Sequence, residues 1–103
     1  MEIIFKQYLF RNQTISAEED ATFLFEGTNT SNEEVKVTKV VTSCGCTSAT
    51  YPKVLGAGQT FMVQVIIDKK GQPGNFNQSV TMSFSNGEQI KLKVNGTVEQ
   101  PEY

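Results

Sequence analysis

Cys44 and Cys46 lie two positions apart, with Gly45 between them, in the run Ser-Cys-Gly-Cys-Thr. Thiols this close can form a disulfide, bind a soft metal or exchange with a partner's thiol. In an extended strand the Cα atoms of such a pair are about 6.5 Å apart. A disulfide requires Cβ atoms separated by about 3.8 Å, so the pair closes only where the glycine lets the backbone turn.

The residues alone leave four interpretations of this pair open. The thiols pack the end of a strand, form a reversible disulfide or exchange with another thiol, hold a soft metal, or link the chain to another molecule. Structural zinc takes four ligands, and the chain offers two cysteines and no histidine. Copper(I) accepts fewer ligands, but Met62 and Met82 alternate within predicted strands and are expected in the core. Cys44 and Cys46 are therefore candidate functional thiols, and no metal or cofactor site is predicted.

The absence of histidine from the chain restricts its chemistry. It removes the Cys-His and Ser-His nucleophile pairs, and with them the usual general base near neutral pH. No other constellation of nucleophile and base stands out. The sequence therefore predicts no catalytic residues and a protein that is not an enzyme.

Length and charge limit the other classes of function. A chain of 103 residues predicts one domain, spanning residues 1–103. The net charge of −2 gives no basic field for nucleic acid, and no apolar run approaches the roughly 18 residues of a membrane span. We therefore expect a protein partner, no nucleic acid and no membrane insertion. The first residues lack the features of a signal peptide, so the protein is either cytosolic or has had a targeting segment removed.

Period-two alternation of apolar and polar residues dominates the pattern. Residues 78–85 and 89–98 alternate on either side of Asn86-Gly87, a strong hairpin signal because both positions tolerate a positive φ. Residues 60–68 carry apolar side chains on both faces, which suggests a central or covered strand. Residues 33–42 change phase after Thr38-Lys39, which indicates a bulge.

These runs predict an all-β fold with little or no helix, an immunoglobulin-like antiparallel β-sandwich of about seven strands. A small barrel is the alternative. The inter-sheet disulfide and the tryptophan of immunoglobulins are missing, because the two cysteines are too close in sequence and there is no tryptophan. Tyr51, Pro52 and Phe76 are apolar residues in predicted loops. They form either a contact patch or a cover over the open end of the sandwich.

The order of these segments resembles a bacterial family of domains of unknown function, DUF 1573, whose signature is Ser-Cys-Gly-Cys-Thr. The resemblance rests on Phe23-x-Phe25, Asn29 and Val35-x-Val37 before the pentapeptide. It continues through Tyr51-Pro52, Leu55-Gly56-Ala57-Gly58, Gly74-x-Phe76 and the closing Leu92-x-Val94-x-Gly96-x-Val98. It implies an immunoglobulin-like sandwich akin to pilus chaperones, and an extracytoplasmic location in the periplasm or at the cell surface.

The combined interpretation is a non-catalytic protein-binding or structural module. Its partner would meet an exposed strand edge or the loops around Cys46 and Phe76. The alternative is a thiol redox or copper-handling accessory protein that uses Cys44 and Cys46.

Overall fold

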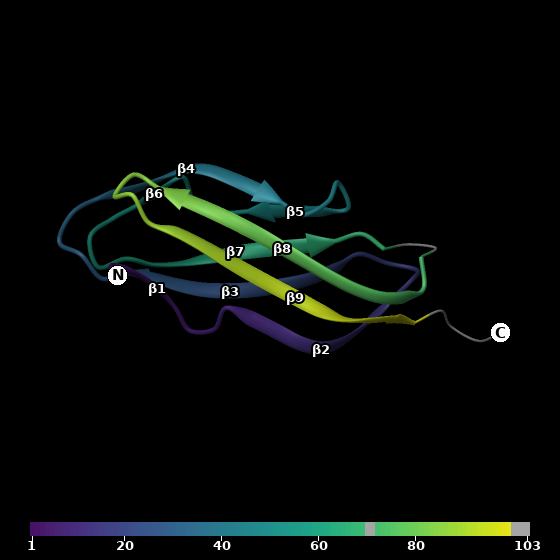
Figure 1. Ribbon diagram of the computed structural model, residues 1–103. Helices are drawn as coiled ribbons and strands as arrows, with labels where there is room; N and C mark the ends of the chain where they lie inside the picture. The colour runs from purple at the N-terminus through teal and green to yellow at the C-terminus, as the bar shows by residue number, and fades with distance from the viewer. Residues whose placement is uncertain (70–71, 100–103) are drawn as a thin grey trace.

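The computed structural model describes residues 1–69 and 72–99, and these form two β-sheets packed face to face (Figure 1). The described residues contain strands and turns and no helix. The strands are β1 (Ile3–Phe5), β2 (Leu9–Ser16), β3 (Ala21–Asn29), β4 (Val35–Thr42), β5 (Thr47–Thr50), β6 (Val54–Leu55), β7 (Thr60–Ile67), β8 (Gly74–Phe84) and β9 (Gln89–Glu99). The predicted all-β sandwich is confirmed.

One sheet has the order β1-β3-β7-β5 and the other β2-β9-β8-β4-β6. The described chain has nine strands rather than about seven because β1, β5 and β6 are two to four residues long. Alternation over so few residues gives no signal in the sequence. Strands β2 and β9 run parallel, whereas all the other pairs are antiparallel, so the sandwich is mostly antiparallel, as the alternation predicts.

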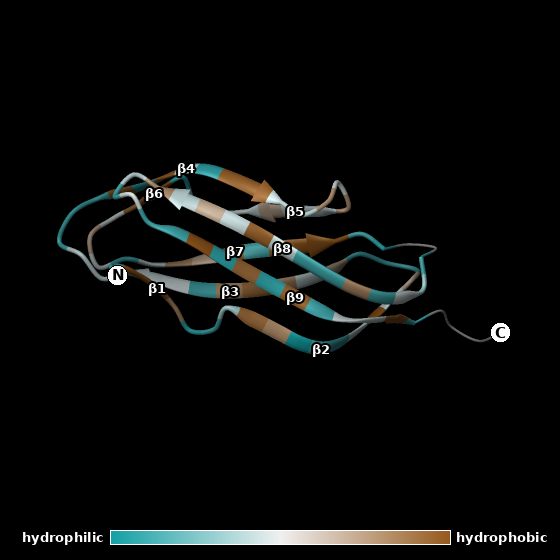
Figure 2. Cartoon of the chain, viewed as in Figure 1, coloured by the Kyte–Doolittle hydropathy of each residue, from teal (hydrophilic) through white to brown (hydrophobic). Residues whose placement is uncertain are grey.

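The core lies between the two sheets and is built by the alternation visible along β8 and β9 (Figure 2). Strand β7 is central in its sheet, as its apolar second face suggests. Met82 is fully buried, as expected, but Met62 is 42 % exposed on the outer face of the four-stranded sheet. The expectation that Met62 is a core residue is wrong because the inward positions of β7 are Phe61, Val63, Val65 and Ile67.

The predicted bulge near Thr38 is confirmed, since the register of β4 against β8 shifts between Val37 and Lys39. A second bulge interrupts β2 between Phe10 and Gln13. Asn12 there has a φ of 56°, a conformation that asparagine tolerates better than most residues. Bulges of this kind bend a strand and increase its twist, and here they lie in β2 and β4 of the five-stranded sheet.

The β8–β9 turn ties one sheet to the first strand of the other. The Glu88 carboxylate accepts hydrogen bonds from the backbone N–H groups of Glu2, at 2.6 Å, and Ile3, at 2.9 Å. Partial burial raises the pKa of Glu88, but these two N–H groups and the Asn86 amide outweigh it, so the net pKa is below its usual 4.5. The ionised carboxylate is the form that holds β1 in place.

Replacing this carboxylate by an amide, Glu88→Gln, is expected to cost about 1 kcal/mol of stability at pH 7. A group whose pKa is lowered by folding stabilises the protein above its unfolded pKa, and this contribution disappears as the pH falls through the folded pKa. The difference between the variant and the wild type should therefore shrink as the pH falls from 7 to below 4.5. Urea unfolding at pH 7 and pH 3 measures this, and an equal difference at both values would refute it.

Candidate functional site

The Ser-Cys-Gly-Cys-Thr run is the crossover between the two sheets. Strand β4, which precedes it, belongs to the five-stranded sheet, and β5, which follows, belongs to the four-stranded sheet (Figure 1). The run is therefore a short connection at one end of the sandwich, in agreement with the expectation that the cysteines mark the end of a strand.

Both ends of this crossover are anchored by hydrogen bonds. On the β8 side, the Ser43 hydroxyl donates to the Gln78 side-chain oxygen at 2.6 Å and accepts from the Ser79 N–H at 3.0 Å. The Ser43 N–H also donates to the Ser79 carbonyl. On the β7 side, the Cys46 carbonyl accepts from the Asp68 N–H at 2.8 Å. The crossover thus clamps the end of one sheet to the end of the other.

The two cysteines are joined in a disulfide, with Cα atoms 5.3 Å apart. This is shorter than the extended-strand spacing because the backbone turns at Gly45, and it does so without the positive φ that favours glycine. Both side chains are half-buried, and the Cys46 N–H donates to the Cys44 sulfur at 3.2 Å. Thr47 is 4 % exposed, and its hydroxyl lies 3.8 Å from each sulfur. One buried hydroxyl therefore contacts both halves of the disulfide.

This arrangement bears on the four interpretations of the cysteine pair. Neither cysteine is free in this structure, so neither presents a thiolate to a metal or a second chain. Within residues 1–69 and 72–99, no three histidine, cysteine or carboxylate residues gather as metal ligands would. A disulfide closed over a single glycine and half exposed at the surface can still take part in exchange with an external thiol.

Opening this disulfide is expected to lower stability modestly. A cross-link that closes so small a loop restricts the unfolded chain little, so Cys44→Ser with Cys46→Ser should cost about 1–2 kcal/mol. Urea unfolding with and without dithiothreitol measures the effect, with the double variant as the control that the reductant should not shift. A wild-type midpoint unmoved by complete reduction, as verified by mass, would contradict this role.

The three residues of the predicted contact patch have different environments. Phe76 on β8 is 5 % exposed and belongs to the core, so it is not available as a surface contact. Its inward direction follows from its place in the alternation of β8, which begins earlier than the sequence pattern showed. Tyr51 and Pro52 are half-buried in the segment that leads from β5 to β6, and Tyr51 packs against the core.

An open strand edge lies between this segment and the disulfide turn. Strand β6 pairs with β4 at Val35 and Lys36, and the Lys53 carbonyl accepts from Val37. Beyond that point, no strand in the described part of the chain pairs with the outer side of β4 as far as Thr42. Sequence reasoning missed this edge, because the order of strands in a sheet is not visible in the alternation of one strand.

The direction of the backbone groups on this edge follows from the register. The Ser43 N–H points to β8, and antiparallel pairs alternate between bonded and unbonded residues. Val40 and Thr42 therefore direct their N–H and C=O groups away from β8, toward the open edge. Val41, between them, is 49 % exposed, and Val54 on the adjoining β6 is 46 % exposed.

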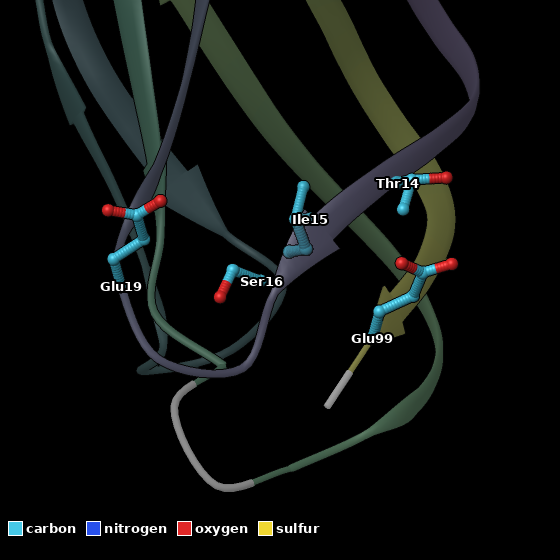
Figure 3. Close-up of a pocket in the computed structure, with 5 residues that line it drawn as sticks. All are labelled: Thr14, Ile15, Ser16, Glu19 and Glu99. Carbon is cyan, nitrogen blue, oxygen red and sulfur yellow. The ribbon is translucent and has the colours of Figure 1, made fainter. Parts of the chain in front are cut away.

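A shallow cavity of about 420 Å³ is present near the end of β2. It is lined by Thr14, Ile15, Ser16, Glu19 and Glu99 (Figure 3). The two carboxylates come from separate segments and lie on either side of Ile15 and Ser16 in this view. They do not converge on one point, so the cavity presents no evident site for chemistry.

Two sheets packed face to face and joined by short crossovers define an immunoglobulin-like β-sandwich. Comparison with known families then identifies the chain more narrowly. It belongs to the family described as "Protein of unknown function (DUF1573)", whose profile matches residues 3–98. The resemblance inferred from the Ser-Cys-Gly-Cys-Thr run is therefore confirmed.

Solved structures with the same fold come from distant proteins. The PapD-like domain 7 of human CEP192 matches with a TM-score of 0.79 and 10 % identity, covering 98 % of this chain and 87 % of that one. A protein of unknown function from Porphyromonas gingivalis matches with a TM-score of 0.77 and 9 % identity, over 93 % and 46 %. The Vibrio cholerae VesB protease matches with a TM-score of 0.66 and 14 % identity, covering 94 % of this chain and 32 % of that one.

These likenesses establish the fold and no activity, because all are at or below 14 % identity. A search of curated proteins found no significant match. The described residues also contain no helix with the length and apolar character that crossing a membrane requires.

Proposed function

We propose that this chain is a non-catalytic protein-binding module whose partner adds a strand to the open edge of β4. The observation that carries this proposal is the unpaired edge from Thr38 to Thr42, with the backbone groups of Val40 and Thr42 directed outward. Main-chain hydrogen bonds from such an edge give affinity to an extended peptide, and the flanking side chains give selectivity.

The surroundings of this edge support the proposal. It ends at Pro52-Lys53 on one side and at the disulfide turn on the other, so its length is fixed at about five residues. Val41 and Val54 expose apolar surface beside it. The other outer strand of this sheet, β2, has a bulge at Asn12 and no large exposed apolar side chain. Of the two edges, β4 is thus better suited to strand addition.

Selection of random peptides on the intact domain tests this function. Peptides that bind should be extended, and they should shift the amide NMR signals of Val40 and Thr42 more than those of β2. Binding that maps elsewhere, or a selection that yields no binder, would refute the proposal. The non-catalytic part fails separately if the protein shows sustained turnover in an insulin-reduction assay.

A thiol redox role is the second candidate, and the half-exposed disulfide favours it. A pair separated by one residue and open to solvent is a substrate for thiol–disulfide exchange with a partner. The measurement is the equilibrium of the pair with glutathione, read by alkylation and mass. A pair that resists reduction across the physiological range would remove this role. Copper handling requires both thiols reduced and is tested by titrating the reduced protein with copper(I).

An extracytoplasmic location is part of the same proposal. Disulfides persist in the periplasm and at the cell surface and are rare in the reducing cytosol. The Cys44–Cys46 disulfide is consistent with an oxidising compartment. Alkylation of the natural protein in intact and in lysed cells tests the location. If the protein were found with its two thiols free in the cytosol, the proposed location would be wrong.

A further inference from the structure

The lysines of the chain are concentrated on the sheet that carries the open edge. The registers of β4, β8 and β9 place Lys36, Lys39, Lys91 and Lys93 on the outer face of the five-stranded sheet. None of the four forms an ion pair with a described residue. Among the described residues that face outward from these three strands, Glu99 is the one carboxylate, and it lies at the far end of β9.

This face is polar between the lysines. Ser79, Thr81 and Ser83 cover the outer side of β8, between the lysines of β4 and those of β9. The outer face of the other sheet has a different character, because Ile4, Leu24 and Met62 are exposed there and Lys6 pairs with Glu26 at 2.7 Å. The chain as a whole carries a net charge of −2. The positive charge beside β4 is thus local and not a property of the whole molecule.

From this distribution we infer that the partner segment is acidic, an extended peptide with a carboxylate beside Lys39. This inference rests on the proposed function, since it names the chemistry of the strand that β4 receives. A strand placed next to β4 sets a residue directly opposite each outward side chain, with Cβ atoms about 4.5–5.5 Å apart. Lys39 faces the outer side of this edge, and Lys36 lies on the same face.

Lys39 also disfavours the simplest alternative partner for the edge, which is a second copy of this chain. Two β4 edges that paired over Thr38–Thr42 would bring the two copies of Lys39 to one seam. Like charges across neighbouring strands are destabilising, and edge lysines are a common barrier to pairing between identical sheets. A carboxylate at that position changes the repulsion to attraction. Lys39 therefore both disfavours self-association and selects an acidic partner.

The test uses capped synthetic heptapeptides in which valine alternates with glutamate, or with glutamine as the uncharged control. Each is titrated into the ¹⁵N-labelled, disulfide-intact domain. The glutamate peptide should bind about threefold more tightly than the glutamine peptide, and this difference should shrink in high salt. The largest shifts should be at the amides of Val40 and Thr42. Lys39→Gln should abolish the preference. Lys91→Gln, on the same face but two strands from the edge, should keep it.

The outcomes of this experiment distinguish the preference for an acidic peptide from the proposed binding edge on which it rests. If both peptides shift the edge amides with equal affinity, the acidic preference is wrong and the binding edge stands. If the glutamate peptide shifts signals spread over β8 and β9, or if Lys91→Gln acts as strongly as Lys39→Gln, diffuse attraction replaces strand addition and the inference is overturned. If neither peptide at millimolar concentration shifts the amide signals of Val40 and Thr42, the proposal that this edge binds a partner is wrong.

Discussion

Gly96→Ala is expected to destabilise the domain by more than about 3 kcal/mol, a large part of the 5–15 kcal/mol available to a domain of this size. Gly96 on β9 pairs with Gln13, directly after the bulge at Asn12 in β2. A Cβ atom at Gly96 would overlap the backbone N, C and O of Gln13. Its φ of 157° is also one that residues with a side chain rarely adopt.

The clash is with backbone rather than with a flexible side chain, so β2 would have to separate from β9. That separation would open the parallel pair and expose the core beneath Ile15. Urea unfolding gives the free energy of unfolding for comparison with two other glycines. Gly74 has a positive φ, but no atom lies within 4 Å of the position that an added Cβ would take. Gly74→Ala is therefore expected to cost about 1–2 kcal/mol. Gly45 is exposed, has no positive φ and has open space around an added Cβ, so Gly45→Ala should be nearly neutral.

A Gly96→Ala variant with a midpoint close to that of Gly45→Ala would show that β2 adjusts without cost. The bulge at Asn12 would then be a flexible feature of the edge. In that case the bulge would not make β2 a less suitable edge for a partner than β4.

The sequence predicts the sandwich because alternation is a local property. In β8 and β9 the inward and outward positions follow from the chain itself, and Asn86-Gly87 marks the turn between them. Which strands become edges is decided by pairing between distant segments, such as β2 with β9. No local pattern contains that information, so the open side of β4 became visible only in the structure.

The candidate site shows the same division. Cys44 and Cys46 stand out because their residue type is rare, and their position at the end of a strand was predicted. The Thr47 hydroxyl lies 3.8 Å from each sulfur because the backbone turns between Cys44 and Thr47. The Ser43 bonds to β8 depend on the pairing of β4 with β8. Phe76 was assigned to a loop because the glycines and proline before it end the visible alternation, yet β8 begins at Gly74 and buries it.

Asn29→Asp, the second change with a large expected effect, should cost about 3 kcal/mol or more at pH 7. Asn29 is fully buried at the end of β3. Its amide nitrogen donates to the carbonyls of Glu33, Leu55 and Gly56 at 2.9–3.1 Å. Aspartate keeps the shape but replaces the donor with a charged oxygen that faces three carbonyl oxygens. The other side-chain oxygen would keep the N–H and hydroxyl of Ser31 as donors. A buried carboxylate that faces carbonyl oxygens and has no opposite charge beside it still costs several kcal/mol.

The pH dependence of this variant distinguishes charge from shape. Burial next to carbonyl oxygens raises the pKa of the new carboxyl in the folded state, because the neutral form can donate one hydrogen bond. The penalty is therefore full above the folded pKa and shrinks as the pH falls toward the unfolded pKa near 4. Asn32→Asp, exposed in the same turn, is the matched control and should lose little at either pH.

Asn29 also bears on the binding edge, because it holds the carbonyl of Leu55, and Leu55 pairs with Val35 where β6 covers the start of β4. An Asn29→Asp protein that stays folded at low temperature should loosen β6 before the rest of the sheet. Hydrogen exchange at β6 would then rise while β8 stays protected. Uniform loss of protection across both would mean that this asparagine stabilises the domain as a whole and does not set the length of the open edge.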